Sequence, residues 1–391
     1  MIEMTIGDWM EKIAAEYPQT EAVVYPHRGL RWTYREFVDI VNQAAKALIA
    51  LGVKHGEHVS VWATNYPEWL VLQFATAKVG AVLVTVNTNY KRYELEYLLR
   101  QSDTSTLFMI GGFKDNDYLS HIYAICPELE TAQKGELTSA KLPYLKRVIY
   151  IGGADNSKAP AGMYRWDEFF ALGKQITDEQ LDARARVCQP HECINMQYTS
   201  GTTGFPKGVM LTHYNILNNG KSIGDCMNLT PVDRLCIPVP LFHCFGCVLG
   251  VLACVTHATT MVMVEYFNPL RVMEAIQWEK CTAVHGVPTM FISILEHPDF
   301  NKYDFSTLRT GIMAGSPCPI EYMRKCVDKM HMTEITIAYG QTESSPVLTQ
   351  TRMDDSLERR VSTVGRCLPG VEVKIIDINT GKDAPYGVQG E

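Results

Sequence analysis

The sequence lacks an excess of basic residues. Its 391 residues include 36 Lys and Arg against 43 Asp and Glu, which gives a net charge of −7 and an isoelectric point near 5.9. Proteins that bind nucleic acid through its phosphates carry a basic surface, so this composition argues against a nucleic-acid partner. An anionic small molecule would instead have to be held by a few local donors.

The sequence also lacks the marks of export. Its first ten residues, M-I-E-M-T-I-G-D-W-M, contain neither the basic region nor the apolar region of a signal peptide. The 12 cysteines lie scattered in apolar runs, without the regular framework of a small disulfide-rich domain. We therefore expect reduced thiols and a cytoplasmic protein.

Long uncharged runs are scarce, and the one at residues 245–264 has the length of a membrane-spanning helix, about 20 residues. Gly246 and Gly250 in it have the spacing of helix contacts. However, residues 256–260 read T-H-A-T-T, and residues 259–264 favour a strand. The run is interpreted as a buried helix, a turn and a buried strand, and no membrane span is expected.

What the sequence does have is a regular alternation of helix and strand patterns in a chain of ordinary composition, 46% hydrophobic and 20% charged. Thr33 and Glu36, for example, form a capping-box pair that opens an amphipathic helix ended by Gly52. Apolar strands are expected at residues 59–63, 81–86, 106–110, 193–198 and 234–239. The alternation predicts an α/β fold with two largely parallel sheets covered by helices, whose ligands lie at the carboxyl ends of the strands.

The pattern of helix and strand signals along the sequence divides the chain into three predicted parts. Residues 1–190 form a first α/β subdomain that contributes strands to the large domain, and residues 191–355 a second one. From residue 356 the pattern changes to short β runs, at 361–364 and 371–377, followed by a hairpin turn at 379–381. Residues 356–391 are therefore expected to begin a small, incomplete β-barrel.

Residues 199–208, T-S-G-T-T-G-F-P-K-G, form the most informative motif. They lie between two apolar runs, C-I-N-M-Q-Y and V-M-L, so they are expected to connect two strands. Three glycines allow backbone N–H groups to converge, the hydroxyls add donors, and Lys207 adds a cation, a combination suited to a polyphosphate. A nucleotide P-loop is disfavoured, because Lys207 precedes glycine and a strand-like run where that motif has Ser or Thr and a helix.

The motif resembles the phosphate loop of the adenylate-forming superfamily, which includes acyl-CoA synthetases, luciferases and peptide-synthetase adenylation domains. A second segment, Y-G-Q-T-E at residues 339–343, follows a β-prone run and matches the same superfamily. The resemblance implies that Tyr339 stacks on adenine, Thr342 meets the α-phosphate and Glu343 holds Mg²⁺. It implies an ATP site made of Thr199, Ser200, Gly201, Thr202, Thr203, Gly204, Lys207, Gly315, Ser316, Pro317, Tyr339, Gly340, Gln341 and Thr342.

The segment P-L-F-H-C-F-G at residues 240–246 is similar to the superfamily's motif beside the acyl carboxylate, which makes His243 an orienting group. Cys244 and Cys247 also form a C-x-x-C pair, but a second pair at metal spacing is missing. Peptide-synthetase domains have aspartate where His243 stands, to pair the substrate's ammonium, so amino-acid substrates are disfavoured. The residues expected to line an apolar acyl pocket are His243, Phe245, Val248, Gly286, Val287, Met290, Met313 and Gly340.

The amino-acid sequence around Tyr339 and at residues 284–291 is most similar to that of medium-chain fatty-acyl-CoA synthetases. This resemblance implies that ATP, Mg²⁺ and coenzyme A serve a ligase that makes acyl-AMP and then acyl-CoA, with Thr342, Glu343, His243 and Lys207 as catalytic groups. Its partners would be these small molecules, and a monomer and a homodimer are both compatible with it. The family's small C-terminal domain, with its late catalytic lysine, would lie beyond Glu391, so the 391 residues alone are expected to turn over slowly or not at all.

Two other functions fit the same motifs. A luciferase-like or other adenylating enzyme shares the first half-reaction, and AMP release that depends on CoA would separate it from a ligase. A nucleotide-binding module without turnover is the other alternative for the 391 residues. A longer gene product, by about 100 residues or more, would favour the ligase.

Overall fold

The structure, a computed structural model, describes residues 1–152, 159–199 and 204–391, and contains two large sheets. The nine-stranded sheet is parallel in its centre and antiparallel at both edges. In spatial order its strands are β18 (Arg366–Cys367), β17 (Val347–Gln350), β16 (Glu334–Gly340), β15 (Thr310–Ala314), β14 (Ala283–Gly286), β12 (Arg234–Ile237), β13 (Thr260–Met263), β1 (Glu21–Tyr25) and β2 (Leu30–Thr33).

The seven-stranded sheet is parallel except for its edge strand β11, which pairs antiparallel with β10. Its order is β11 (Lys207–Thr212), β10 (Cys193–Thr199), β4 (Val82–Thr85), β3 (His58–Trp62), β5 (Thr106–Met109), β8 (Arg147–Tyr150) and β9 (Tyr164–Arg165). Strands β6 (Gly112–Phe113) and β7 (Asn116–Asp117) form a separate hairpin. The predicted α/β architecture of two largely parallel sheets is confirmed.

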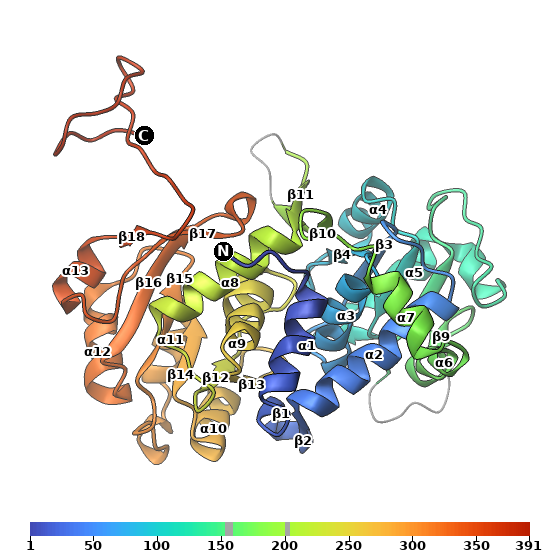
Figure 1. The fold of residues 1–391 in the computed structure, drawn as a ribbon, viewed down its shortest axis with the longest axis horizontal. Helices are drawn as coiled ribbons and strands as arrows, with labels where there is room; N and C mark the ends of the chain where they lie inside the picture. The colour runs from blue at the N-terminus through green and yellow to red at the C-terminus, as the bar shows by residue number, and fades with distance from the viewer. Residues whose placement is uncertain (153–158, 200–203) are drawn as a thin grey trace.

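Helices cover the sheets and fill the space between them (Figure 1). Helix α8 contacts β10 and β11 of one sheet and β17 of the other, and α1 packs against α2, α3 and α9. The α-helices are α1 (Ile6–Glu16), α2 (Tyr34–Ala50), α3 (Pro67–Lys78), α4 (Arg92–Gln101), α5 (Tyr118–Ile125), α6 (Trp166–Leu172), α7 (Asp178–Ala185), α8 (His213–Cys226), α9 (Ala253–Thr256), α10 (Pro269–Glu279), α11 (Pro288–Leu295), α12 (Ile320–Met330) and α13 (Leu357–Ser362). The short helices are η1 (Pro26–Arg28), η2 (Pro127–Glu130), η3 (Gly173–Gln175), η4 (Phe245–Leu252), η5 (Phe300–Lys302) and η6 (Thr342–Ser344).

Local signals place several of these elements where the sequence predicts them. The Thr33 side chain and the Glu36 carboxylate complete the capping box of α2. The apolar run at residues 245–264 forms the π-helix η4, the short helix α9, a turn and the buried strand β13. In the part of the chain that the structure describes, no helix is both long and apolar enough to cross a membrane.

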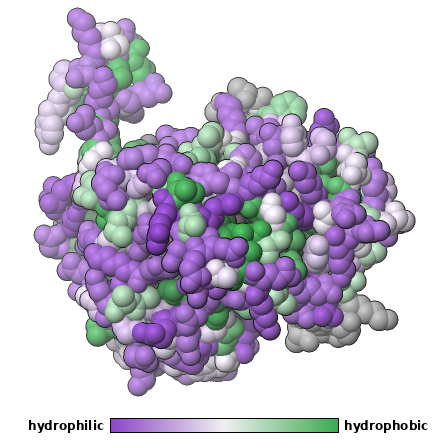
Figure 2. All heavy atoms as spheres, turned by 45° about the vertical axis from the view of Figure 1, so that its right-hand side comes forward, coloured by the Kyte–Doolittle hydropathy of each residue, from purple (hydrophilic) through white to green (hydrophobic). Residues whose placement is uncertain are grey.

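The C-terminal part differs from the prediction. Residues 361–364 do not begin a strand, because Ser356 caps helix α13 and the buried Arg360 donates hydrogen bonds to the carbonyls of Thr333 and Ile335, both at 2.8 Å. Residues 371–391, all of them described, contain one β-bridge, Ile376 to Asp383, around the predicted turn. No closed barrel is formed, and this segment projects from the body (Figures 1 and 2).

The predicted boundary near residue 190 does not coincide with a change of sheet. Strands β10 and β11 extend the seven-stranded sheet, whereas β1 and β2, from the start of the chain, lie in the nine-stranded one. The division into parts 1–190, 191–355 and 356–391 stays a prediction.

An ion pair with a buried carboxylate joins the amino-terminal ends of four strands in the nine-stranded sheet. Asp233, just before β12, accepts two hydrogen bonds from Arg309 (3.1 and 2.9 Å) and others from Thr230 and Thr282. Arg309, just before β15, also contacts Glu334 at 2.6 Å. Burial alone would raise the pKa of the Asp233 carboxyl, but these hydrogen bonds lower it below its usual value. The carboxylate is therefore part of the fold's stability above acidic pH.

We expect Asp233→Ala to lower the free energy of unfolding by about 2 kcal/mol at pH 7, because it removes the buried acceptor of hydrogen bonds from Arg309, Thr230 and Thr282. The native carboxylate stabilises the fold above its unfolded pKa, about 3.9, and this contribution is lost as pH falls through the lower folded value. The difference in the free energy of unfolding between the native protein and the variant should thus become smaller below about pH 4. Urea unfolding at pH 7 and pH 3 measures it, with the exposed Asp354→Ala as a control; a difference independent of pH would contradict the proposed charge effect.

Candidate active site

One cavity of about 610 Å³ opens at the carboxyl ends of strands from both sheets. From the predicted set, its lining includes Thr199, His243, Phe245, Gly315, Tyr339, Gly340, Gln341, Thr342 and Glu343. These residues come from four separate segments of the sequence. The face of the molecule drawn in Figure 2 is largely hydrophilic, with apolar side chains gathered near its centre.

The phosphate-loop motif connects β10 and β11, as its flanking apolar runs predict. Ser200, Gly201, Thr202 and Thr203 lie outside the described residues. Thr199 and Lys207 pair directly across the hairpin, so their side chains share one face of it. Gly204 and Lys207 are exposed.

Helix α4 holds both ends of this motif. The Tyr97 hydroxyl donates to the Pro206 carbonyl at 3.1 Å, and its ring stacks on Phe205 with centroids 5.6 Å apart. On the other side, the Tyr198 hydroxyl donates to the Gln101 side chain. The ends of the phosphate loop are thereby fixed to helix α4.

A hydrogen bond connects the two resemblance motifs. Thr199 Oγ1 donates to Glu343 Oε1 at 3.2 Å, across 144 positions of sequence. Glu343 is exposed on the cavity wall, and it is the one carboxylate among the described residues of the lining. A single carboxylate together with phosphate oxygens is a usual ligand set for Mg²⁺, so the residues present fit that ion.

The turn that follows β16 has little freedom. Gln341 donates its backbone N–H to the Pro346 carbonyl at 3.0 Å, and the buried Thr342 begins η6. A Cβ on Gly340 would lie 2.0 Å from the Pro346 oxygen, so glycine is required there. Tyr339 is 53% exposed and keeps a ring face available beside this turn.

His243 is exposed to the cavity and carries its proton on Nε2, since Nδ1 accepts a hydrogen bond from the Phe245 N–H at 3.1 Å. Although the side chain opens to the cavity, the protein around it displaces water from the ring, which lowers the pKa of His243 and favours the neutral form. Its segment is held by the buried Asn65, which donates to the carbonyls of Val239 and Val264 (both 3.0 Å) and accepts from the Leu241 N–H (2.8 Å). The result is a fixed, neutral hydrogen-bond donor.

The predicted acyl-pocket residues divide into two groups. Phe245, His243 and Gly340 line the cavity, and Phe245 is joined there by Leu249, one helical turn later. Val248 is buried in the core, and Met313 packs into a second core on the face of β15 opposite Ala314, so both lie outside the lining. Gly286 is buried beside Met290. Met290 lines a neighbouring cavity of about 270 Å³. Val287 lies next to Gly315.

The predicted ATP-site residues Gly315, Ser316 and Pro317 are also divided between the cavity lining and the surface beside it. Gly315 lines the cavity with φ +92°, a conformation that favours glycine, while Ser316 and Pro317 are exposed next to it and outside the lining. Other residues of the lining were not predicted from the sequence, including Thr85, Asn87, Tyr90, Gln197, Phe242, Leu249, Ala338 and Val347. Three of these follow or end the predicted strand at 81–86, so the rule that ligands lie at carboxyl ends could have found them.

The profile of the AMP-binding enzyme family matches residues 10–391, and the chain belongs to this family. YngI of Bacillus subtilis (strain 168), to which an acyl-CoA synthetase activity is ascribed, is 54% identical over 391 residues, which cover all of this chain and 70% of YngI. The mitochondrial medium-chain acyl-CoA ligase ACSF2 of Danio rerio is 40% identical and that of Mus musculus 37%. The chain spans 64% of the length of each of these two ligases.

Solved structures confirm the fold. The anthranilate CoA ligase AuaEII in complex with anthranoyl-AMP superposes with a TM-score of 0.83 at 24% identity, over all of this chain and 69% of that one. The inhibitor-bound N-terminal domain of FACL13 from Mycobacterium tuberculosis gives a TM-score of 0.80 at 24% identity, over 98% of this chain and 86% of that one. The architecture is that of the N-terminal domain of adenylate-forming enzymes.

Proposed function

We propose that the protein containing this chain activates a medium-chain fatty acid with ATP and transfers the acyl group to coenzyme A. One observation carries the proposal. In the cavity of about 610 Å³, Thr199 donates a hydrogen bond to Glu343, and His243 and apolar side chains line the same cavity. The names of the relatives support the acyl-CoA ligase class, and the mitochondrial ones support the medium chain.

In the first step, a carboxylate oxygen of the fatty acid attacks the α-phosphorus of ATP, and the bond to pyrophosphate breaks. The Tyr339 ring and the Gly315 turn hold adenine, while Thr342 and the loop from Thr199 to Lys207 donate to phosphate oxygens. Mg²⁺ on Glu343 would offset the negative charge of the phosphates when bound. Positioning and charge neutralisation of this kind supply most of the catalysis in phosphoryl chemistry.

In the second step, the thiol of coenzyme A attacks the acyl carbonyl and AMP leaves. The neutral His243 would donate Nε2–H to an oxygen of the acyl group and orient it. The neighbouring cavity shares Phe242 with the main one and includes the cationic Lys114 in its lining, so we assign the approach of coenzyme A to it. Its walls include the connections that follow strands β3 and β4 of one sheet and β12 and β13 of the other.

The experiment follows both half-reactions with the full-length protein. ATP–pyrophosphate exchange that requires the fatty acid reports the first step, and AMP release that requires coenzyme A reports the second. Exchange without coenzyme-dependent AMP release would favour another adenylating enzyme. Nucleotide binding without exchange would overturn the proposal.

The chain length of the preferred acid follows from the apolar lining. Each methylene that the cavity buries contributes about 0.8 kcal/mol, so kcat/KM should rise about fourfold per added carbon until the cavity is full, and then fall. We expect the maximum among medium-chain acids in a series from acetate to palmitate. A maximum at either end of the series, or a preference for aryl acids, would contradict the assignment.

A further inference from the structure

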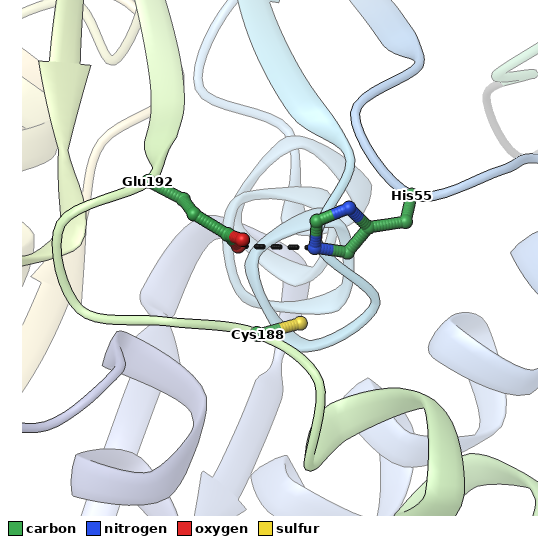
Figure 3. Close-up of side chains that lie close together, drawn as sticks. All are labelled: His55, Cys188 and Glu192. Atoms are coloured by element: carbon green, nitrogen blue, oxygen red, sulfur yellow. Dashed lines mark hydrogen bonds and ion pairs between the residues drawn. The ribbon is translucent and has the colours of Figure 1, made fainter.

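A second cluster of ligand-type side chains lies away from the active site. His55 comes from the connection between α2 and β3, and Cys188 and Glu192 from the connection between α7 and β10. Their ligand atoms all lie within 4.8 Å of one another, and the three side chains point to a common centre (Figure 3). His55 Nε2 and Glu192 Oε2 are 3.0 Å apart.

The position of this cluster separates it from catalysis. Strands β3, β4 and β10 are parallel, and they begin at His58, Val82 and Cys193, next to the cluster. The active-site cavity is lined by the opposite, carboxyl ends of β4 and β10. A ligand at the cluster would therefore act on the framework and not on the reacting atoms.

We propose that His55, Cys188 and Glu192 bind one zinc ion. Imidazole nitrogen, thiolate sulfur and carboxylate oxygen are all zinc ligands, and bond lengths of about 2.0–2.3 Å place such ligands about 3.3–3.7 Å apart. The present spacing needs shifts of about 1 Å or less to reach that arrangement. Cys188 is 6% exposed and lies beneath His55 and Glu192, whose side chains are 36% and 35% exposed, so water can fill the fourth position.

Gly80, which has no side chain, leaves space for His55 and Cys188 in this cluster. A Cβ on Gly80 would lie 2.2 Å from His55 Cδ2 and 2.9 Å from Cys188 Sγ, so glycine alone fits beside the cluster. The Cys188 thiol donates to the carbonyls of Lys78 (3.7 Å) and Arg184 (3.6 Å). When zinc binds, the thiol releases its proton to solvent and a zinc–sulfur bond replaces these contacts. The ion would join the α2–β3 and α7–β10 connections at the start of the strand that leads to the phosphate loop.

Zinc titration of the metal-stripped full-length protein, in buffer without other divalent ions and against a chromophoric chelator, tests the site. We expect one zinc per chain with a Kd of about 1 μM or tighter. Cys188→Ser and His55→Gln should each weaken binding about tenfold or more. Cys193→Ser, five residues along and outside the cluster, should leave the affinity unchanged. A native protein that does not bind zinc, or zinc binding that is unchanged in both cluster variants, would overturn the proposal.

A second measurement keeps the test independent of folding defects. Zinc should raise the Tm of the native protein and of Cys193→Ser, because a ligand that binds only the folded state stabilises it. At the same zinc concentration it should raise the Tm of His55→Gln, which changes an exposed side chain, by clearly less. Cobalt(II) in place of zinc should give a thiolate charge-transfer band that disappears in Cys188→Ser; the absence of the band in the native protein would exclude Cys188 as a ligand.

Discussion

Replacing Glu343 by alanine is expected to lower kcat/KM about 100-fold or more while changing the free energy of unfolding by less than about 0.5 kcal/mol. The carboxylate is exposed on the cavity wall, so its removal leaves no buried partner without a hydrogen bond. Its proposed role is to bind the Mg²⁺ ion that accompanies the phosphates of ATP. The loss should therefore appear in the binding of MgATP and in catalysis, and not in folding.

Isothermal titration with MgATP beside a thermal melt separates the two effects. Glu358→Ala serves as the control, since Glu358 is also an exposed glutamate in a short helical segment but lies outside the cavity lining. The control should keep native affinity and native Tm. Unchanged MgATP affinity in Glu343→Ala would remove the metal role from this residue.

The turn that carries Glu343 illustrates what sequence can predict. The β-prone run before Tyr339 and the glycine after it predict a strand end at the sheet's carboxyl edge, and β16 ends at Gly340. Likewise, the two apolar runs around the phosphate loop predict a strand on each side of it. These features depend on residues close in sequence, where hydrophobic period and turn chemistry decide the structure.

Contacts between distant segments were not predictable in the same way. Strand β1 pairs with β13, with Val23 opposite Met261, and no pattern in the local sequence predicts this pairing. Met313 shows a related limit: an apolar strand buried on both faces has no amphipathic signal, so the sequence could not tell that Met313 faces away from Ala314. At Val361, β propensity was overridden by the anchoring of Arg360 to the start of β16.

Replacing Gly340 by alanine is expected to weaken MgATP binding about 100-fold or more and to lower the free energy of unfolding by about 2 kcal/mol. The new Cβ would lie 2.0 Å from the Pro346 oxygen and 2.9 Å from Val347 Cα, both backbone atoms that cannot rotate away. The turn must therefore open and break the hydrogen bond from Gln341 to Pro346. Tyr339, Thr342 and Glu343 would then leave their places on the cavity wall together.

Gly7→Ala is the matched control for this variant. A Cβ at Gly7 would lie 3.4 Å from Lys78, an ordinary contact, and alanine favours helix α1, so this variant should be as stable as the native protein or slightly more stable. Urea unfolding and MgATP titration of both variants decide the matter. If Gly340→Ala is destabilised but binds MgATP with native affinity, the turn after β16 does not hold the nucleotide. If it is neither destabilised nor impaired, the turn tolerates a side chain, and the close approach of Gly340 to Pro346 does not constrain the site.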